Sequence, residues 1–281
     1  MPSFQIKGAN DMTNVFINWE DIQPEQVTFI DTRFDLGNPS AGREMYDTGH
    51  LEGAIYWDLE QDLSDMSSKM GRHPMISKEN MTELCRQAGL QLDDAIVVYD
   101  QGASPFALRA YFLLEWAGFT NVHVLREGYE IVKELFRVSK EEPVILVSDV
   151  EPDWKDAIYL DVDDVKKVVA GESEGQLIDA RAAFRFKGES EPIDPVAGHI
   201  PTAVNFDWEQ LKQDGKFLEK DLLAKQLQHV TDKNKPVIAY CGSGVTAAPL
   251  YAGLKEAGYT DVKLYVGSYS DWIRDNEVER D

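Results

Sequence analysis

Short apolar runs alternate with longer amphipathic stretches along most of the chain. The short runs lack polar alternation, which predicts strands buried on both sides; they are Val27–Ile30, Ala54–Trp57, Ile96–Tyr99, Val122–Leu125, Leu177–Ile178, Ala203–Phe206, Val237–Tyr240 and Val262–Tyr265. The longer stretches predict helices over Lys78–Leu90, Pro105–Trp116, Asp221–His229 and Ala247–Ala257. Strands and helices in alternation predict an α/β fold, a mainly parallel sheet with helices on both faces.

This pattern occurs twice in the chain. Three sequence blocks return in the same order 140 to 149 residues later: Asp31–Arg33 as Asp179–Arg181, Gly49–His50 as Gly198–His199, and the strand before Asp100 as the strand before Cys241. A repeat of this length is a whole domain rather than a solenoid unit. We therefore expect two tandem domains, 10–140 and 156–281, joined by a linker within Ser139–Lys155.

Charge and apolar content restrict the classes of partner. The chain has 281 residues, 28 Lys and Arg against 50 Asp and Glu, and a net charge of −22. Such an acidic chain lacks the basic clusters that bind phosphates, so neither nucleic acid nor an anionic membrane is an expected partner. No run is long enough to span a bilayer, and the first residues lack the apolar core of a signal peptide. We expect a cytoplasmic protein.

Two cysteines, Cys85 and Cys241, are too few for a disulfide framework. Cys85 lies on the apolar face of a predicted helix, which indicates a core position. Cys241 instead follows a predicted strand and precedes Gly242, Ser243 and Gly244, just before a helix. Sites in parallel α/β sheets lie beyond such strand ends. Loop amides and the helix N-terminus there favour an anion and stabilise a thiolate, so Cys241 is the candidate nucleophile.

Two chemistries use a cysteine in such a loop. Cysteine phosphatases need an arginine after five intervening residues to clamp the phosphoryl oxygens, and here that position is Ala247. The remaining option is a thiolate that accepts a sulfur atom and passes it on as a persulfide. No metal-ligand spacing and no nucleotide-binding loop is present, so neither a metal nor a cofactor is expected.

The repeated Asp-x-Arg and Gly-His blocks, the Cys241 loop and the closing Leu264–Trp272 segment resemble the tandem-domain sulfurtransferases, the rhodanese and 3-mercaptopyruvate sulfurtransferase family. The resemblance covers nearly the whole chain. It implies two rhodanese-like domains, the first catalytically inactive because Asp100 stands where a cysteine would be needed, and an active site in the cleft between them. It also implies a small-molecule sulfur donor, cyanide or a thiol as acceptor, and a thioredoxin-like reductant as partner.

Within that family the loop Cys241–Thr246 is similar to the mercaptopyruvate type, whereas thiosulfate-preferring enzymes often place basic residues after the cysteine. The resemblance implies that Arg185 binds the donor anion, together with the loop residues Gly242, Gly244, Val245 and Thr246. It also implies a serine–histidine–aspartate relay, for which Ser243 and His50 match and the aspartate has no clear counterpart. A second arginine is usual in the following loop, where only Lys187 is available.

Other residues fit a structural role. Asp179 and Arg181 have counterparts in the other copy, which indicates an ion pair that braces the loop, and His199 is expected to bind nearby backbone. A role for Arg72 and His73 in the cleft stays open. Two alternatives to a mercaptopyruvate enzyme also stay open: a thiosulfate:cyanide sulfurtransferase, and a non-catalytic sulfur-carrier or sensor module.

Overall fold

The computed structural model describes residues 14–281, so the predicted start of the first domain at residue 10 lies outside the described part. The chain forms two compact units. The first unit contains the described residues up to Ser64, then Ile76–Lys155 and Asp214–Lys216; the second contains Asp65–Met75, Asp156–Gln213 and Phe217–Asp281. The segment Asp65–Met75 therefore belongs to the second unit although its neighbours in the sequence belong to the first. The segment Asp214–Lys216 belongs to the first unit although its neighbours belong to the second.

The first unit is built on a five-stranded parallel sheet of order β1-β6-β5-β2-β4. Its strands are β1 (Phe16–Ile17), β2 (Thr28–Asp31), β4 (Ile55–Tyr56), β5 (Ile96–Tyr99) and β6 (Val122–Leu125). The helices are α1 (Ala41–Thr48), α2 (Lys78–Gln87), α3 (Phe106–Trp116) and α4 (Tyr129–Val132). A small antiparallel pair joins β3 (His50–Leu51) to β7 (Val138–Ser139).

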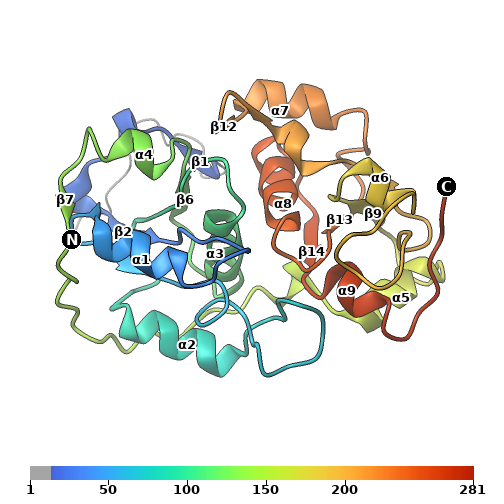
Figure 1. The fold of residues 1–281 in the computed structure, drawn as a ribbon, viewed down its shortest axis with the longest axis horizontal. Helices are drawn as coiled ribbons and strands as arrows, with labels where there is room; N and C mark the ends of the chain where they lie inside the picture. Colours follow the sequence, from blue (N-terminus) through green and yellow to red (C-terminus); the bar gives the residue numbers. More distant parts are fainter. Residues whose placement is uncertain (1–13) are drawn as a thin grey trace. The chain divides into compact units, whose positions relative to one another are not determined.

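The second unit has a sheet of the same kind, of order β10-β9-β13-β14-β8. Its strands are β8 (Tyr159–Leu160), β9 (Gln176–Asp179), β10 (Val204–Asn205), β13 (Val237–Tyr240) and β14 (Val262–Tyr265), all paired in parallel. The helices are α5 (Val162–Val169), α6 (Ala183–Phe186), α7 (Lys220–Leu227), α8 (Ala247–Glu256) and α9 (Ser268–Trp272), and β11 (Lys212–Gln213) pairs with β12 (Lys216–Phe217). Figure 1 shows the first unit in blue to green and the second mainly in yellow to red.

Burial explains why these segments form sheets. All four residues of β5 and all four of β13 are buried, and successive strand residues point to opposite faces, so each sheet is covered on both sides. The helix after each of these strands, α3 or α8, packs on it and on the next strand, and almost every residue of both helices is buried. Each predicted strand and helix is present, with ends shifted by a few residues at most.

The connector between the repeats runs along the first unit. Ser148 N donates to the carbonyl of Arg86 at 3.0 Å, and Asp153 N donates to that of Ala117 at 3.0 Å. In the middle of the connector the Val144 side chain is 98% exposed, whereas Ile145 and the backbone of Leu146 lie against Gly89. In the part of the chain that the structure describes, no helix is long and apolar enough to cross a bilayer.

Candidate active site

Cys241 lies at the carboxyl end of β13, which is the central strand of the second unit's sheet. Its side chain is buried, and the amide of Gly244 donates to its sulfur at 3.1 Å. The cysteine backbone is held from the other side, because its N–H donates to Ser268 Oγ at 3.1 Å and its carbonyl accepts from Tyr269 N at 2.9 Å. The sulfur is therefore fixed next to an amide that stabilises negative charge on it.

The loop that carries the cysteine depends on Gly244. This residue has φ of +74°, and a Cβ there would meet the carbonyl oxygen of Val266 at 2.2 Å. Buried Val245 and the N-cap residue Thr246 lead from the glycine into α8. The N-terminus of this ten-residue helix follows directly, and its dipole favours an anion.

Ser243 is paired with a histidine from a distant part of the sequence. His73 Nδ1 lies 2.9 Å from Ser243 Oγ, and both side chains are buried. His73 belongs to the segment Asp65–Met75, which is part of the second unit. The neighbouring Arg72 N–H donates to Ser270 Oγ at 3.1 Å, which fixes this segment beside α9. Serine and histidine can thus exchange a proton within the unit that carries the cysteine.

Two guanidinium groups approach the loop at Gly242. A Cβ at Gly242 would meet Arg72 Nη2 at 2.6 Å and Arg185 Nη2 at 3.5 Å. Arg185, on α6, is the arginine that the sequence predicts for donor binding. Arg72 is a second one, and it comes from the segment whose role the sequence left open. Together they place two cations beside the residue that follows the cysteine.

Both arginines are held by carboxylates. Asp194 pairs with Arg72 and also with Arg185, from which it accepts at 3.1 Å. Glu191 accepts from Arg185 Nε at 2.9 Å. Burial raises the pKa of Asp194 in spite of its two arginine partners. Burial opposes ionisation of Glu191 too, but its hydrogen bonds from Arg185 and from two backbone amides outweigh this and lower its pKa.

The same network reaches the Asp-x-Arg block. Arg181 is fully buried, pairs with Asp179 at 2.6 Å and donates to the carbonyl of Gly198 at 2.7 Å. Its Nη1 donates to Glu191 at 3.1 Å. Three guanidiniums thus share three carboxylates, Asp179, Glu191 and Asp194, and the six formal charges cancel.

The structure gives His50 a different place from the predicted relay. His50 lies in the first unit, fully buried and stacked on Tyr46 at 3.7 Å. Its Nδ1 lies 2.9 Å from the carbonyl oxygen of Tyr46, and its Nε2 lies 3.1 Å from that of Glu141. Neither nitrogen is available to Ser243, because both face backbone carbonyls of the first unit. His73, not His50, is the histidine at the serine.

His199 repeats the arrangement of His50 in the second unit. It stacks on Phe186 at 3.8 Å, and its Nδ1 lies 2.8 Å from the carbonyl oxygen of that residue. A histidine present in both copies therefore holds a helix end against a strand. His73 has no counterpart in the other copy, and this was the sequence signal that could have separated it from His50.

Lys187 does not stand beside the two arginines in this network. Its side chain is half exposed, and its Nζ lies 4.0 Å from the carboxylate of Glu189. The second cation at Gly242 is Arg72, so the acidic loop after α6 supplies carboxylates rather than a donor-binding cation.

The equivalent loop of the first unit is occupied by its own carboxylate. Asp100 follows β5 as Cys241 follows β13, and it accepts from the amides of Gly102 at 2.8 Å and Ala107 at 3.1 Å. Burial raises the pKa of Asp100 to about 6. The loop of the first unit thus holds an internal carboxylate, through the amides of Gly102 and Ala107 rather than through that of Ala103, the counterpart of Gly244.

Comparison with known proteins finds one domain family in both halves of the chain. A family model described as "Rhodanese-like domain" matches residues 18–135 and 161–275. The chain belongs to the tandem-domain rhodanese family. A probable 3-mercaptopyruvate sulfurtransferase of Pseudomonas aeruginosa is 37% identical over 254 residues, which cover 88% of this chain and 89% of that one. A putative thiosulfate sulfurtransferase of Mycobacterium tuberculosis is 35% identical over 261 residues, which cover 89% of each chain.

Solved structures of the rhodanese family have the same fold. SseA from Escherichia coli, described as a 3-mercaptopyruvate sulfotransferase, matches with a TM-score of 0.76 at 29% identity, over 92% of this chain and 99% of that one. The two matched regions and these relatives confirm the predicted fold class of two rhodanese-like α/β domains. Among residues 14–281, no group of three or more His, Cys, Asp or Glu side chains is arranged to hold a metal ion.

Proposed function

We propose that this sulfurtransferase carries sulfur on Cys241 as a persulfide, from a small anionic donor to cyanide or a thiol. The observation that carries the proposal is the loop itself: a cysteine sulfur held 3.1 Å from an amide, at a strand end, beside two guanidiniums at Gly242. The thiolate attacks the sulfur of the donor, and a new S–S bond forms while the bond that held that sulfur breaks.

With 3-mercaptopyruvate the broken bond is the C–S bond, and its electron pair leaves on the enolate of pyruvate. The pair formed by Ser243 and His73 is placed to deliver the proton that this enolate takes up. In the second half of the cycle, cyanide or a thiolate attacks the outer sulfur. The S–S bond then breaks, and the thiolate of Cys241 is regenerated.

The charges at the site favour 3-mercaptopyruvate over thiosulfate. Arg72 and Arg185 can bind a carboxylate, but Asp194 and Glu191 already balance their charge. A monocarboxylate adds one negative charge to a neutral cluster, whereas thiosulfate adds two. The two residues directly after the cysteine, Gly242 and Ser243, have no basic side chain of their own. Thiosulfate remains the alternative donor, and one similar protein is named a putative thiosulfate sulfurtransferase.

The persulfide cycle also bears on the cellular compartment and on the protein partner. Cys85 and Cys241 are both free thiols, and burial raises the pKa of Cys85 to about 12, which leaves Cys241 to carry the chemistry. A reducing compartment keeps such thiols from oxidation to disulfides, so we place the protein in the cytoplasm. A thioredoxin-like reductant is the protein acceptor that this chemistry fits.

The deciding experiment follows thiocyanate and the mass of the intact chain. Wild-type protein with 3-mercaptopyruvate and cyanide should produce thiocyanate, and with the donor alone it should gain the mass of one sulfur atom. Cys241→Ser should lose both signals, while Cys85→Ala, the matched control, should keep them. Thiocyanate production by Cys241→Ser at the wild-type rate would falsify the persulfide mechanism. The ratio of kcat/KM for mercaptopyruvate and thiosulfate then decides the donor.

A further inference from the structure

The two copies of the Asp-x-Arg block bind their arginine in the same way. Arg33 donates from Nε to both oxygens of Asp31 at 3.0 Å and from Nη2 to the carbonyl of Gly49 at 2.7 Å. Arg181 makes the same bonds to Asp179 and Gly198, with the same distances. Each guanidinium also lies over a tyrosine ring, at 3.7 Å in the first unit and 3.8 Å in the second.

The copies differ at one nitrogen of this arginine. Nη1 of Arg181 donates to the carboxylate of Glu191 at 3.1 Å. Among the residues that the structure describes, Nη1 of Arg33 has no hydrogen-bond or ion-pair partner, although that side chain is only 4% exposed. The protein does not fully enclose this nitrogen, so it borders open space. The first unit therefore has an unused donor where the second has a carboxylate.

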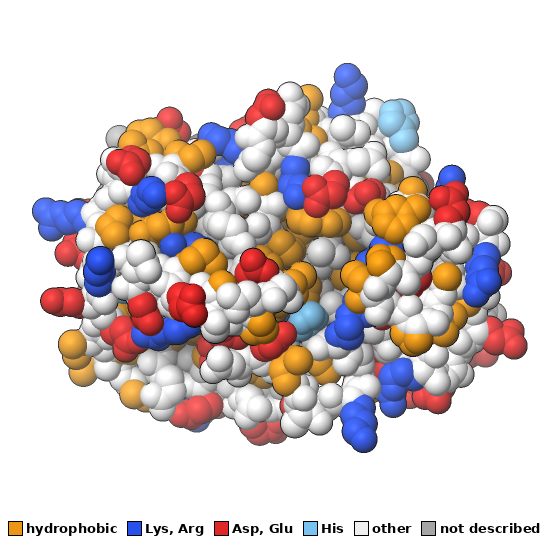
Figure 2. Space-filling view, viewed as in Figure 1, with side chains coloured by type: hydrophobic (Ala, Val, Ile, Leu, Met, Phe, Trp, Pro, Cys, Tyr) orange, Lys and Arg blue, Asp and Glu red, His pale blue; other side chains and the backbone are white. Residues whose placement is uncertain are grey.

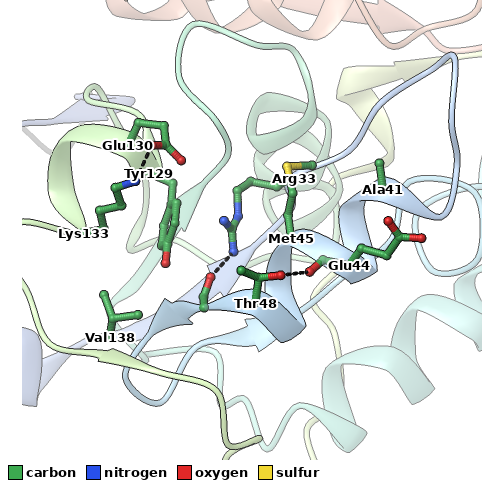
Figure 3. Close-up of a pocket in the computed structure, with 10 residues that line it drawn as sticks. Arg33, Ala41, Glu44, Met45, Thr48, Tyr129, Glu130, Lys133 and Val138 are labelled. Atoms are coloured by element: carbon green, nitrogen blue, oxygen red, sulfur yellow. Dashed lines mark hydrogen bonds and ion pairs between the residues drawn. The ribbon is translucent and has the colours of Figure 1, made fainter.

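That open space is a pocket of about 510 Å³ in the first unit. Figure 3 shows the Arg33 guanidinium next to the Tyr129 ring, with the side chains of Thr48, Lys133 and Val138 around them. The Tyr129 hydroxyl is a second donor with no partner within residues 14–281. The equivalent hydroxyl of Tyr269 is enclosed by the protein, so only the first unit presents this pair of donors to a pocket.

The carboxylates that line the pocket are engaged elsewhere. Glu130 pairs with Lys133, and Glu44 accepts from the hydroxyl of Ser40 at 3.1 Å. Neither makes the contact to Arg33 that Glu191 makes to Arg181. Lys133 is one-third exposed and also lines the pocket, where its charge is balanced by Glu130.

We propose that this pocket binds a small monocarboxylate, with its oxygens accepting from Arg33 Nη1 and the Tyr129 hydroxyl. The second unit identifies the chemistry, because the same guanidinium nitrogen is bound there by the carboxylate of Glu191. A ligand carboxylate thus takes the place that an internal side chain fills in the other copy. The site lies wholly in the first unit and is separate from the Cys241 loop.

Acetate is the probe that tests the pocket. The melting temperature of the full chain is followed against sodium acetate, with sodium chloride at equal ionic strength as the reference. We expect a saturating rise with acetate alone, since a ligand that binds the folded state stabilises it. Tyr129→Phe removes one hydrogen bond and should weaken acetate binding about 2- to 10-fold. A wild-type response equal to that of chloride would overturn the proposal.

A second pair of variants fills the pocket from within. Met45 lines it, so Met45→Glu supplies an internal carboxylate, and Met45→Gln is the control of the same shape without charge. Met45→Glu should melt higher than Met45→Gln without acetate and should lose the acetate response, whereas Met45→Gln should keep it.

The variant Arg185→Ala distinguishes acetate binding in the pocket from acetate binding near Cys241, because it removes a guanidinium near Cys241. The acetate response should persist in this variant. A response that is lost in Arg185→Ala but kept in Met45→Glu would place the acetate at Cys241 and reject the pocket.

Discussion

Arg72 and Arg185 meet at Gly242 from segments more than a hundred residues apart in the sequence. Each is tied to Asp194, so their guanidiniums are held in place before any donor arrives. Preorganised donors bind an anion without the cost of ordering their side chains. In the proposed function, the donor carboxylate meets a fixed pair of cations rather than two mobile ones.

Removing either guanidinium should weaken donor binding more than it slows the chemistry. Arg72→Gln and Arg185→Gln should each raise the KM for 3-mercaptopyruvate about 10-fold or more, because each removes a charge-assisted hydrogen bond. Steady-state kinetics at saturating cyanide measure this change. Arg43→Gln, which removes an exposed arginine of the first unit, is the control and should leave KM unchanged. An unchanged KM in Arg72→Gln would exclude that residue from donor binding.

At this scale the sequence singled out Cys241, Ser243 and Arg185, but it did not predict that Arg72 and His73 lie beside them. The position of Cys241 after a strand and before two glycines was enough to place it. The histidine was assigned to His50 because the Gly-His block was the visible motif. The sequence left the role of Arg72 and His73 open, because nothing in the spacing of Asp65–Met75 says that this loop folds onto the second unit; the contacts of His73 with Ser243 and of Arg72 near Gly242 come from the structure.

The element that decides the site is the turn between β13 and α8. Gly244 holds a left-handed conformation with φ of +74°, and its amide donates to the sulfur. In the first unit the equivalent residue is Ala103, with φ of +47°. An L-residue is thus accepted in the turn that no longer carries a cysteine.

Gly244→Ala should damage both stability and turnover. The new Cβ combines left-handed strain with a clash against the carbonyl of Val266, and we expect a loss of at least about 3 kcal/mol in the free energy of unfolding. Gly171→Ala is the matched control, since Gly171 has the same φ of +74° and nothing lies within 4 Å of a Cβ there. It should lose only about 1 to 2 kcal/mol and keep its kcat. Urea denaturation measures the free energies of unfolding. Equal losses in the two variants would show that the clash with Val266 does not contribute.

Elements with strong patterns were predictable and short ones were not. The four-residue strands β2, β5, β6, β13 and β14 lie within a residue of their predicted bounds. The two-residue strands β1 and β8 were missed, since two residues show no periodicity, whereas β4 and β10 are equally short but lie within four-residue apolar runs. The helix α6, which carries Arg185, is a single turn and was missed for the same reason.

The net negative charge of the whole molecule repels the proposed anionic donor. The net charge is −22, and Figure 2 shows acidic side chains spread among basic ones on the visible face. The attraction for an anionic donor must therefore be local, from the loop amide, the helix N-terminus, Arg72 and Arg185. Long-range steering works against the donor.

This predicts how turnover depends on salt. Between low and moderate sodium chloride concentration, kcat/KM for 3-mercaptopyruvate should rise or stay flat, because screening weakens the repulsion by the whole molecule. Rates at subsaturating donor give this quantity, and melting temperatures in the same buffers exclude an effect on folding. A steep fall would mean that a basic field around the site dominates the encounter.

The segment Asp65–Met75 limits how far the two repeats can be treated as modules. A fragment that begins at residue 156 would retain Cys241, Ser243 and Arg185, yet it would lack His73, which contacts Ser243, and Arg72, which approaches Gly242. Domain swaps between relatives, or attempts to trim the protein to a minimal catalyst, must therefore transplant eleven residues from the other half of the sequence. The two repeats have similar folds, but the catalytic unit cannot be separated from the rest of the chain at the boundary between the repeats.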